Sequence, residues 1–220
     1  MNKGKQMEEY NKSEINLYVL NENTEREIEK TISEIFSEYN KKEFTGIIFT
    51  CIKELVINAA KANLKRILFE EHNMNIDNEE EYIAGMLRFR EELTTSGILK
   101  YENKLKEKNF WVKISFEYNS SGVIIEVINN AHITKIEEKR LREKLKKAMQ
   151  YTDIAQFYLE QGDEIEGAGM GIALVVMLLR GIGIDPSLFR LGNTKEKKTL
   201  LRIEVPFSDK FVSKREERVH

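Results

Sequence analysis

Cysteine is nearly absent from this sequence, which has one such residue among 220. A lone cysteine cannot form an internal disulfide, so a disulfide-stapled secreted scaffold is excluded and a reducing, cytoplasmic setting is expected. Cys51 lies in the largely apolar run 47–52. We therefore predict that it is a small buried hydrophobe.

Long apolar segments are missing too, and proline occurs at only two positions. No stretch approaches the length of about 18 apolar residues that spans a bilayer, and residues 1–13 lack the apolar centre of a signal peptide. We expect no membrane insertion. A composition of 41% hydrophobic and 33% charged residues is typical of one globular domain with extensions.

A large excess of charge of one sign is also lacking. The 35 basic and 37 acidic residues give a net charge of −2, and the two signs are interspersed through most segments. No large basic field is available to hold phosphodiester backbones. Nucleic acid is therefore not an expected partner.

The hydrophobic patterns predict helices and strands in an α+β order. Segment 44–72 is the strongest helix prediction, because it has no proline and no glycine after Gly46. Asn119-Ser120-Ser121-Gly122 is rich in turn residues and predicts a hairpin. The other expected elements are a strand at 15–20, helices at 24–39, 79–92, 135–150 and 172–180, and strands at 110–118, 123–128, 189–191 and 200–205.

These elements suggest a division of the chain. We interpret residues 1–43 as an N-terminal strand and helix extension, and residues 44–207 as the main domain. The charged segment 73–108 is interpreted as an insertion beside its core, and residues 208–220 as a polar tail.

The predicted helix at 44–72 carries an acid, an amide and a cation on one stripe. Glu54, Asn58 and Lys61 are separated by four and three residues, which places them on the same helical face. An amide oxygen suits Mg²⁺, an ammonium group suits phosphate, and a carboxylate can orient a nucleophile. The alternative is that the stripe simply faces solvent, as most polar stripes do.

A glycine-rich segment precedes the apolar helix at 172–180. Gly167, Gly169 and Gly171 alternate with Ala168 and Met170, so that backbone N–H groups at a helix N-terminus can approach phosphates. No Gly-Lys-Ser or Gly-Lys-Thr follows, which excludes a Walker loop. Alone, the segment is equally compatible with a structural turn or close helix packing.

Together, and in this order, the two motifs resemble a known family. Residues 54–63 resemble the N box, and residues 167–174 the second glycine box, of the GHKL or histidine kinase-like ATPases, which have the Bergerat ATP-binding fold. The resemblance covers about residues 44–206. It implies an α/β (α+β) two-layer sandwich with helices on a mixed, mostly antiparallel sheet, and ATP between the N-box helix and a glycine-rich lid.

The resemblance also implies roles for individual residues. Asn58 would hold Mg²⁺ and Lys61 would contact phosphate, while Gly167, Gly169 and Gly171 would line the phosphate path. Glu54 matches the acid that positions water in the ATPases or assists phosphotransfer in the kinases.

The part that would bind the base departs from the family pattern. Asn129 stands where an aspartate normally receives the adenine amino group, and Ala131 and Ile133 replace glycines. Ala62 occupies a position that is usually aromatic in histidine kinases. Thr199 resembles the threonine of the final strand and is interpreted as a further nucleotide contact or a surface residue of that strand.

The sequence therefore predicts a stand-alone, cytoplasmic protein that binds ATP and Mg²⁺, with a protein partner in a signalling pathway. ATPase and protein kinase activities both remain open. One alternative is a nucleotide-degenerate relative that regulates other proteins by binding them. Another is a serine kinase of the anti-sigma-factor kind.

Overall fold

Five strands form one sheet in the computed structural model, which describes residues 9–151, 155–156, 159 and 170–215. The strands are β1 (Asn11–Leu17), β2 (Val112–Asn119), β3 (Gly122–Asn129), β4 (Phe189–Asn193) and β5 (Thr199–Pro206). Their order is β1-β2-β3-β5-β4, and all four pairings are antiparallel. The expected α+β class is confirmed, and within the described residues the sheet has no parallel pair.

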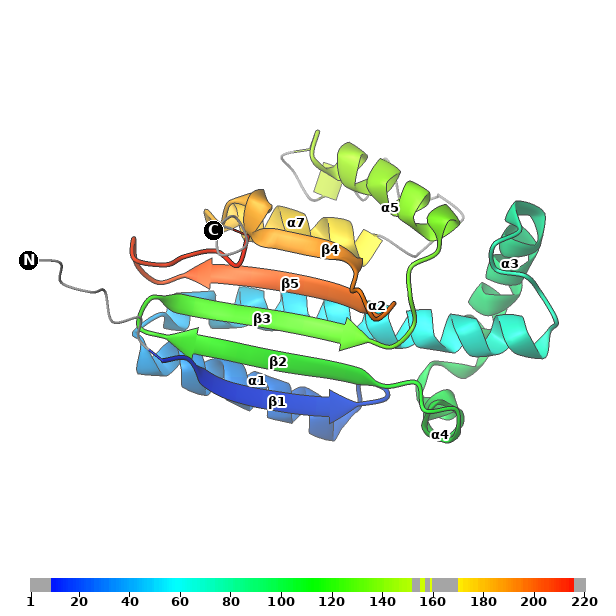
Figure 1. The fold of residues 1–220 in the computed structure, drawn as a ribbon, viewed down its shortest axis with the longest axis horizontal. Coiled ribbons are helices and arrows are strands. Elements are labelled where there is room, and N and C mark those ends of the chain that lie inside the picture. The colour runs from blue at the N-terminus through cyan, green and yellow to red at the C-terminus, as the bar shows by residue number, and fades with distance from the viewer. Residues whose placement is uncertain (1–8, 152–154, 157–158, 160–169, 216–220) are drawn as a thin grey trace, which may run out of the picture.

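Three helices pack on one face of this sheet and form the second layer (Figure 1). They are α1 (Glu22–Glu38), α2 (Thr45–Glu71) and α7 (Met170–Gly181). Outside this layer lie α3 (Glu79–Ser96), α4 (Glu102–Glu107) and α5 (Lys135–Ala148). Short 3₁₀ turns occupy Lys42–Phe44, Leu99–Tyr101 and Pro186–Leu188. No helix in the described ranges combines the length and apolarity that crossing a bilayer requires.

The main core lies between the sheet and these three helices. In β2, Val112, Ile114 and Phe116 are fully buried against the helices, whereas Lys113 and Ser115 point to the other face and are partly exposed. This alternation follows from the two-residue period of a strand. Both elements expected before residue 44 contribute to this core, since β1 pairs with β2 and α1 packs on α2.

The prediction of a strand at 15–20 is shifted, because β1 spans Asn11–Leu17. Only Ile15 and Leu17 of this edge strand are buried, so its first half carries no apolar signal. Val19 belongs instead to a second hydrophobic cluster. Edge strands are held by backbone pairing, which is why polar residues such as Asn11 and Lys12 extend the ladder.

The β2–β3 turn has the two-residue length expected of a tight hairpin, and Asn119 Oδ1 accepts a 2.9 Å hydrogen bond from Ser121 N. Gly122 is required there, because an added Cβ would lie 2.7 Å from the Val205 carbonyl oxygen. The described part of the expected tail, residues 208–215, contacts β2 close to this turn. Lys214 Nζ lies 2.7 Å from a Glu117 carboxylate oxygen.

α2 continues beyond the sheet, where α3 and α4 pack around its C-terminal half (Figure 1). The segment interpreted as an insertion thus shares a second, smaller core with α2. This second cluster contains Val19, Leu64, Ile67, Leu68, Phe69, Tyr82, Met86, Phe89, Tyr101 and Leu105. Gly85 lets α3 approach α2 closely, because a Cβ at that position would lie 2.3 Å from the Phe69 ring.

Candidate functional site

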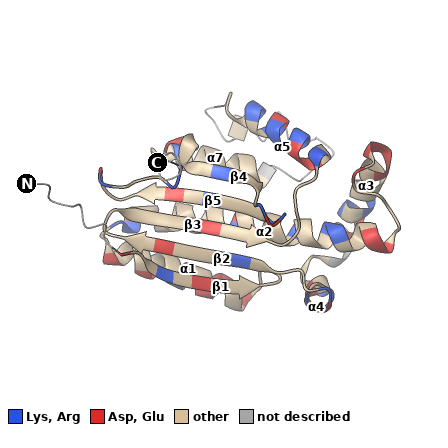
Figure 2. Cartoon of the chain, viewed as in Figure 1, with Lys and Arg blue, Asp and Glu red and all other residues tan. Residues whose placement is uncertain are grey.

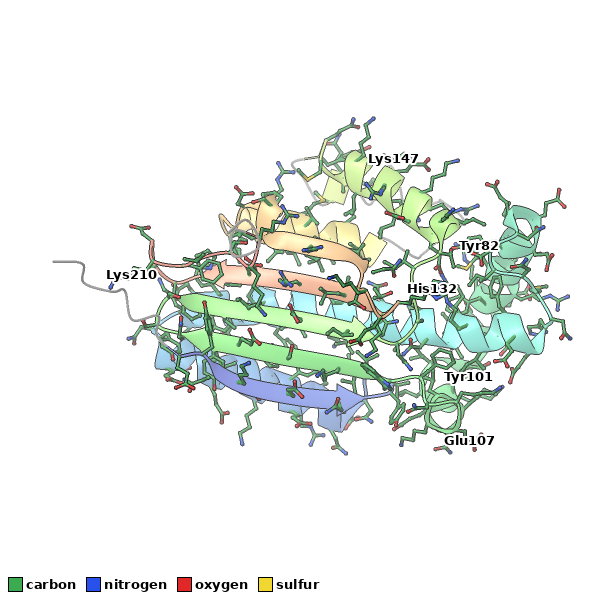
Figure 3. The ribbon with its side chains drawn as sticks, in the orientation of Figure 1. Tyr82, Tyr101, Glu107, His132, Lys147 and Lys210 are labelled. Atoms are coloured by element: carbon green, nitrogen blue, oxygen red, sulfur yellow. The ribbon has the colours of Figure 1, made fainter. Side chains whose placement is uncertain are left out.

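A cavity of about 420 Å³ opens where α2 leaves the sheet. Its walls come from α2, α3, α5, α7 and the ends of β3, β4 and β5, so elements from most of the described chain meet there. The labelled Tyr82 and His132, which both line the cavity, lie at the end of the molecule between α5 and α3 (Figure 3). A cavity of this size is in the range that holds small-molecule ligands and cofactors.

Four of the residues predicted from sequence line this cavity. Asn58 and Lys61 come from α2, Asn129 from the end of β3, and Thr199 from the start of β5. Lys61 makes no hydrogen bond or ion pair with any residue that the structure describes. Its ammonium group therefore adds a positive charge to the α2 wall that no described residue neutralises.

Glu54 and Gly171 lie immediately beside Asn58. A Cβ placed on Gly171 would be 2.4 Å from Glu54 Oε2 and 2.8 Å from Asn58 Nδ2, so the start of α7 touches the predicted stripe on α2. A side chain at position 171 would collide with Glu54 and Asn58, which explains why a glycine is present there. The stripe does not face solvent at Asn58, since its Nδ2 is buried and has no hydrogen-bond partner in the described part of the chain. Gly167 and Gly169 lie outside the described residues.

Asn129 is fully buried, and its amide is oriented by a chain of hydrogen bonds. Asn63 Nδ2 donates to the Trp111 carbonyl at 2.9 Å, which leaves Asn63 Oδ1 as an acceptor. Asn129 Nδ2 donates to that oxygen at 2.9 Å and to the Ala131 carbonyl at 3.4 Å. Asn129 Oδ1 is thereby fixed as the remaining atom, and it has no partner among the described residues.

An unsatisfied acceptor in the wall of a cavity is notable because leaving a buried polar group unpaired costs roughly 1–3 kcal/mol. A ligand that donates a hydrogen bond to Asn129 Oδ1 would remove that cost. The carbonyl oxygen of an amide can serve as this acceptor without carrying charge.

Thr199 helps to shape the same wall. Its Oγ1 donates to the Ala131 carbonyl at 2.7 Å, and its backbone N–H donates to the same oxygen at 3.2 Å. Ile133 and Asn193 exchange two hydrogen bonds of 2.8 and 2.9 Å. The loop after β3 is therefore fastened to the β4–β5 hairpin, and the Thr199 hydroxyl proton is already engaged.

A buried ion-pair group joins α2 to α5 at the cavity. Glu137 accepts from Lys65 Nζ at 2.7 Å and from Arg66 Nη1 at 3.1 Å. It also accepts from the backbone of Thr134, the N-cap of α5, at 3.0 Å. Burial alone would raise the pKa of Glu137, but the adjacent Lys65 and Arg66 outweigh it and hold the pKa far below its ordinary value.

The cavity lining is mainly apolar but has an excess of positive charge. Its basic residues are Lys61, Lys65, Arg66, Arg90 and Arg140, and Glu137 is its one acidic residue within the described part of the chain. Figure 2 shows lysine and arginine on α5 and on the part of α2 that leaves the sheet. Such a site favours an anionic ligand with an apolar portion.

Sequence reasoning missed Lys65, Arg66, Glu137 and the α3 residues of this lining. Lys65 is 5% exposed although lysine is rarely buried, and its partner is 72 positions away in sequence. The capping box formed by Thr134 and Glu137 was the available sequence signal, and it marks the start of a helix rather than a site. Neither the capping box nor the sequence around Lys65 indicates that α2 and α5 lie close together.

Comparison with known proteins identifies a similar chain of unassigned role. A protein of Treponema pallidum (strain Nichols), described as an uncharacterized protein, is 32% identical over 180 residues. The aligned region is 82% of this chain and 34% of that protein, so the chain spans about a third of the relative's length. No protein-family model matches the chain. No solved structure matches it either.

Proposed function

We propose that this chain binds Mg²⁺-ATP in the cavity beside α2, as a member of the histidine kinase-like ATPase group with a Bergerat-type fold. The observation that carries the proposal is the convergence of Asn58, Lys61 and the unsatisfied Asn129 Oδ1 on one cavity. The resemblance to the histidine kinase-like ATPases assigns Asn58 and Lys61 to the phosphates and Asn129 to the base.

The order of the elements supports the proposal. The helix with the predicted N-box stripe precedes the β2–β3 hairpin, and α7 with its glycine-rich start follows it. Both helices pack on the same face of the antiparallel sheet, and Gly171 lies in the contact between them. A helix N-terminus is a suitable environment for phosphate, and Ile172 in the first turn of α7 lines the same cavity as Lys61.

Lys61 and Asn58 fit the phosphate end of such a ligand. The Lys61 ammonium group would offset phosphate charge, and Asn58 Nδ2, which has no partner among the described residues, would donate to a phosphate oxygen. The described residues contain no group of three or more histidine, cysteine, aspartate or glutamate side chains suited to a resident metal. A metal held by Asn58 together with phosphate oxygens and water fits this donor set, because Mg²⁺ uses few protein ligands.

Asn129 and the apolar lining fit the base end. The adenine amino group is a hydrogen-bond donor, which matches the free acceptor Oδ1. Ala59, Ile172 and Leu201 provide apolar surface for the faces of the ring. Asn129 would thus keep the recognition role of the family's aspartate without its charge.

Glu54 is the candidate for chemistry, since its carboxylate lies against Gly171 next to Asn58. When bound, Mg²⁺ would neutralise charge that develops on the phosphates. Glu54 would orient an attacking water in an ATPase, or the hydroxyl group of a protein substrate in a kinase. We place either activity in the cytoplasm, with a signalling protein as partner.

Calorimetric titration with Mg²⁺-ATP tests the proposal. The native chain should bind saturably, and Asn58→Ala and Lys61→Ala should each weaken binding by about tenfold or more. Lys30→Ala is the charge-matched control, because Lys30 lies on the exposed side of α1 in a surface pair with Glu34. Absence of binding by the native chain would reject ATP and favour a protein-binding regulator.

A second measurement separates the two activities if ATP binds. Radiolabelled γ-phosphate should appear as free phosphate for an ATPase, or on a partner serine for a kinase of the anti-sigma-factor kind. Glu54→Gln should abolish either product while ATP binding persists.

A further inference from the structure

One wall of the cavity comes from α3, in the segment inserted between α2 and β2. Tyr82, Met86, Phe89 and Leu93 all line the cavity, and their spacing of four, three and four residues places them on a single helical stripe. Ile83 and Leu87 of the same helix do not line the cavity and are about half exposed. The stripe is thus turned specifically toward α2 and the cavity.

In the α2 part of the cavity wall, one side chain is small. Ala62 lines the cavity between Lys61 and Lys65, and its methyl group provides little surface for a planar ring. The apolar surface that Ala62 does not supply is present on α3, because Met86 and Leu93 extend into the lining of the same cavity.

α3 is held firmly in this position. Phe69 and Tyr82 pack with ring centroids 6.0 Å apart, and Gly85 allows the close approach to Phe69. The Tyr82 ring also lies 5.6 Å from Lys65 Nζ and 4.9 Å from the Arg140 guanidinium carbon. Cations at these distances are attracted to the ring face, so Tyr82 connects α2, α3 and α5.

We infer that the α3 stripe is the base-contacting wall of the nucleotide site, with Met86 and Leu93 as specificity-determining residues that pack against the purine ring. This inference rests on the proposed function. Methionine suits such a contact, because its flexible, polarisable thioether adapts to an aromatic face. The phosphate end, at Asn58 and Lys61, lies on α2, and neither Met86 nor Leu93 carries a group that would pair with phosphate.

The inference predicts a difference between two ligands. ATP has both a base and phosphates, whereas inorganic triphosphate has phosphates alone. Met86→Ala and Leu93→Ala should each raise the Kd for Mg²⁺-ATP about tenfold, since loss of apolar contact in a binding pocket has effects of this order. Their Kd for Mg²⁺-triphosphate should stay within about twofold of the native value, because no phosphate contact changes.

Leu87→Ala is the matched control, since Leu87 adjoins Met86 on the outer side of α3 and does not line the cavity. Met86→Leu should restore most of the ATP affinity, because it conserves volume. Far-ultraviolet circular dichroism and thermal melting would identify variants that fail to fold. If Met86→Ala fails to fold, the ATP and triphosphate affinities of Met86→Leu are compared with those of the native chain instead.

Each outcome is decisive. ATP binding that is unchanged in both alanine variants would overturn the role of α3 and leave the proposed function standing. An equal loss of ATP and triphosphate binding would also overturn it, because the variants would then act on the site as a whole. Failure of the native chain to bind ATP would reject both proposals.

Discussion

Asn129 on β3 donates a 2.9 Å hydrogen bond to Asn63 on α2, and both side chains are fully buried. This link joins the sheet to the long helix at the cavity wall. Asn63 is fixed in turn by its bond to the Trp111 carbonyl, so the orientation of the Asn129 amide depends on α2 and on the residue just before β2. Asn129 Oδ1, which no described residue engages, is thus oriented in the absence of a ligand.

Asn63→Ala should therefore affect both stability and recognition. The substitution leaves the Trp111 carbonyl and Asn129 Nδ2 without these partners, so urea denaturation should show a loss of roughly 1–3 kcal/mol in unfolding free energy. ATP affinity should fall, because Asn129 is no longer held in one orientation. Asn103→Ala on the exposed surface of α4 is the control. Unchanged stability in Asn63→Ala would contradict the orienting role.

Gly171→Ala should separate binding from folding. The added Cβ overlaps the ends of the Glu54 and Asn58 side chains, which can move, and alanine favours a helix over glycine by up to about 1 kcal/mol. We expect unfolding free energy to change by less than about 1 kcal/mol, while displaced Asn58 weakens ATP binding about tenfold or more. Calorimetry and urea denaturation on the same preparation measure both quantities.

Gly181→Ala is the control for this experiment. It lies at the end of the same helix, and a Cβ there would meet nothing within 4 Å. Equal ATP affinities in the two variants would remove the spatial explanation for the glycine.

Glu137→Gln should destabilise the native state by about 3 kcal/mol at neutral pH, because it leaves Lys65 and Arg66 buried without their anion. The pKa of Glu137 is lowered in the folded chain, so its contribution is complete above the unfolded pKa of about 4.3 and is lost as pH falls below it. Urea denaturation at several pH values should show the native and variant curves converging on acidification. A constant difference from pH 7 to pH 3 would refute this linkage.

Cys51 should resist thiol reagents in the folded protein. Burial, together with the nearby charge of Glu54, raises the pKa of its thiol to about 12, and the side chain is fully buried. Thiolate is the reactive species, so labelling by Ellman's reagent at pH 8 should wait for unfolding. The labelling rate should rise with urea along the unfolding curve, whereas immediate labelling of the native protein would count against this packing.

The sequence predicted those features whose determinants lie within one segment. The long apolar helix around Asn58 and the turn at Ser120-Ser121 are present where their local patterns indicated. Lys61, Asn129 and Thr199 line one cavity, whereas their assignment to a nucleotide rests on the resemblance and stays a prediction.

The remaining features depend on contacts between distant segments. The apolar residues of 79–92 indicated a helix, but their pattern could not predict which side of α2 this helix covers. Lys65 looked like an ordinary solvent-facing lysine, because its partner Glu137 is reached only when α5 folds over α2. β1 began four residues before its predicted start, since backbone pairing to β2 leaves no hydrophobic signature.

The length of α2 has a consequence for how the protein can be dissected. Its 27 residues extend for about 40 Å and belong to both hydrophobic clusters. Excising residues 73–108 would expose Leu64, Ile67 and Leu68 to water, which would turn the second half of the helix into an aggregation-prone surface. We therefore expect the inserted segment to be an obligate part of the folding unit and the two clusters to unfold in one transition.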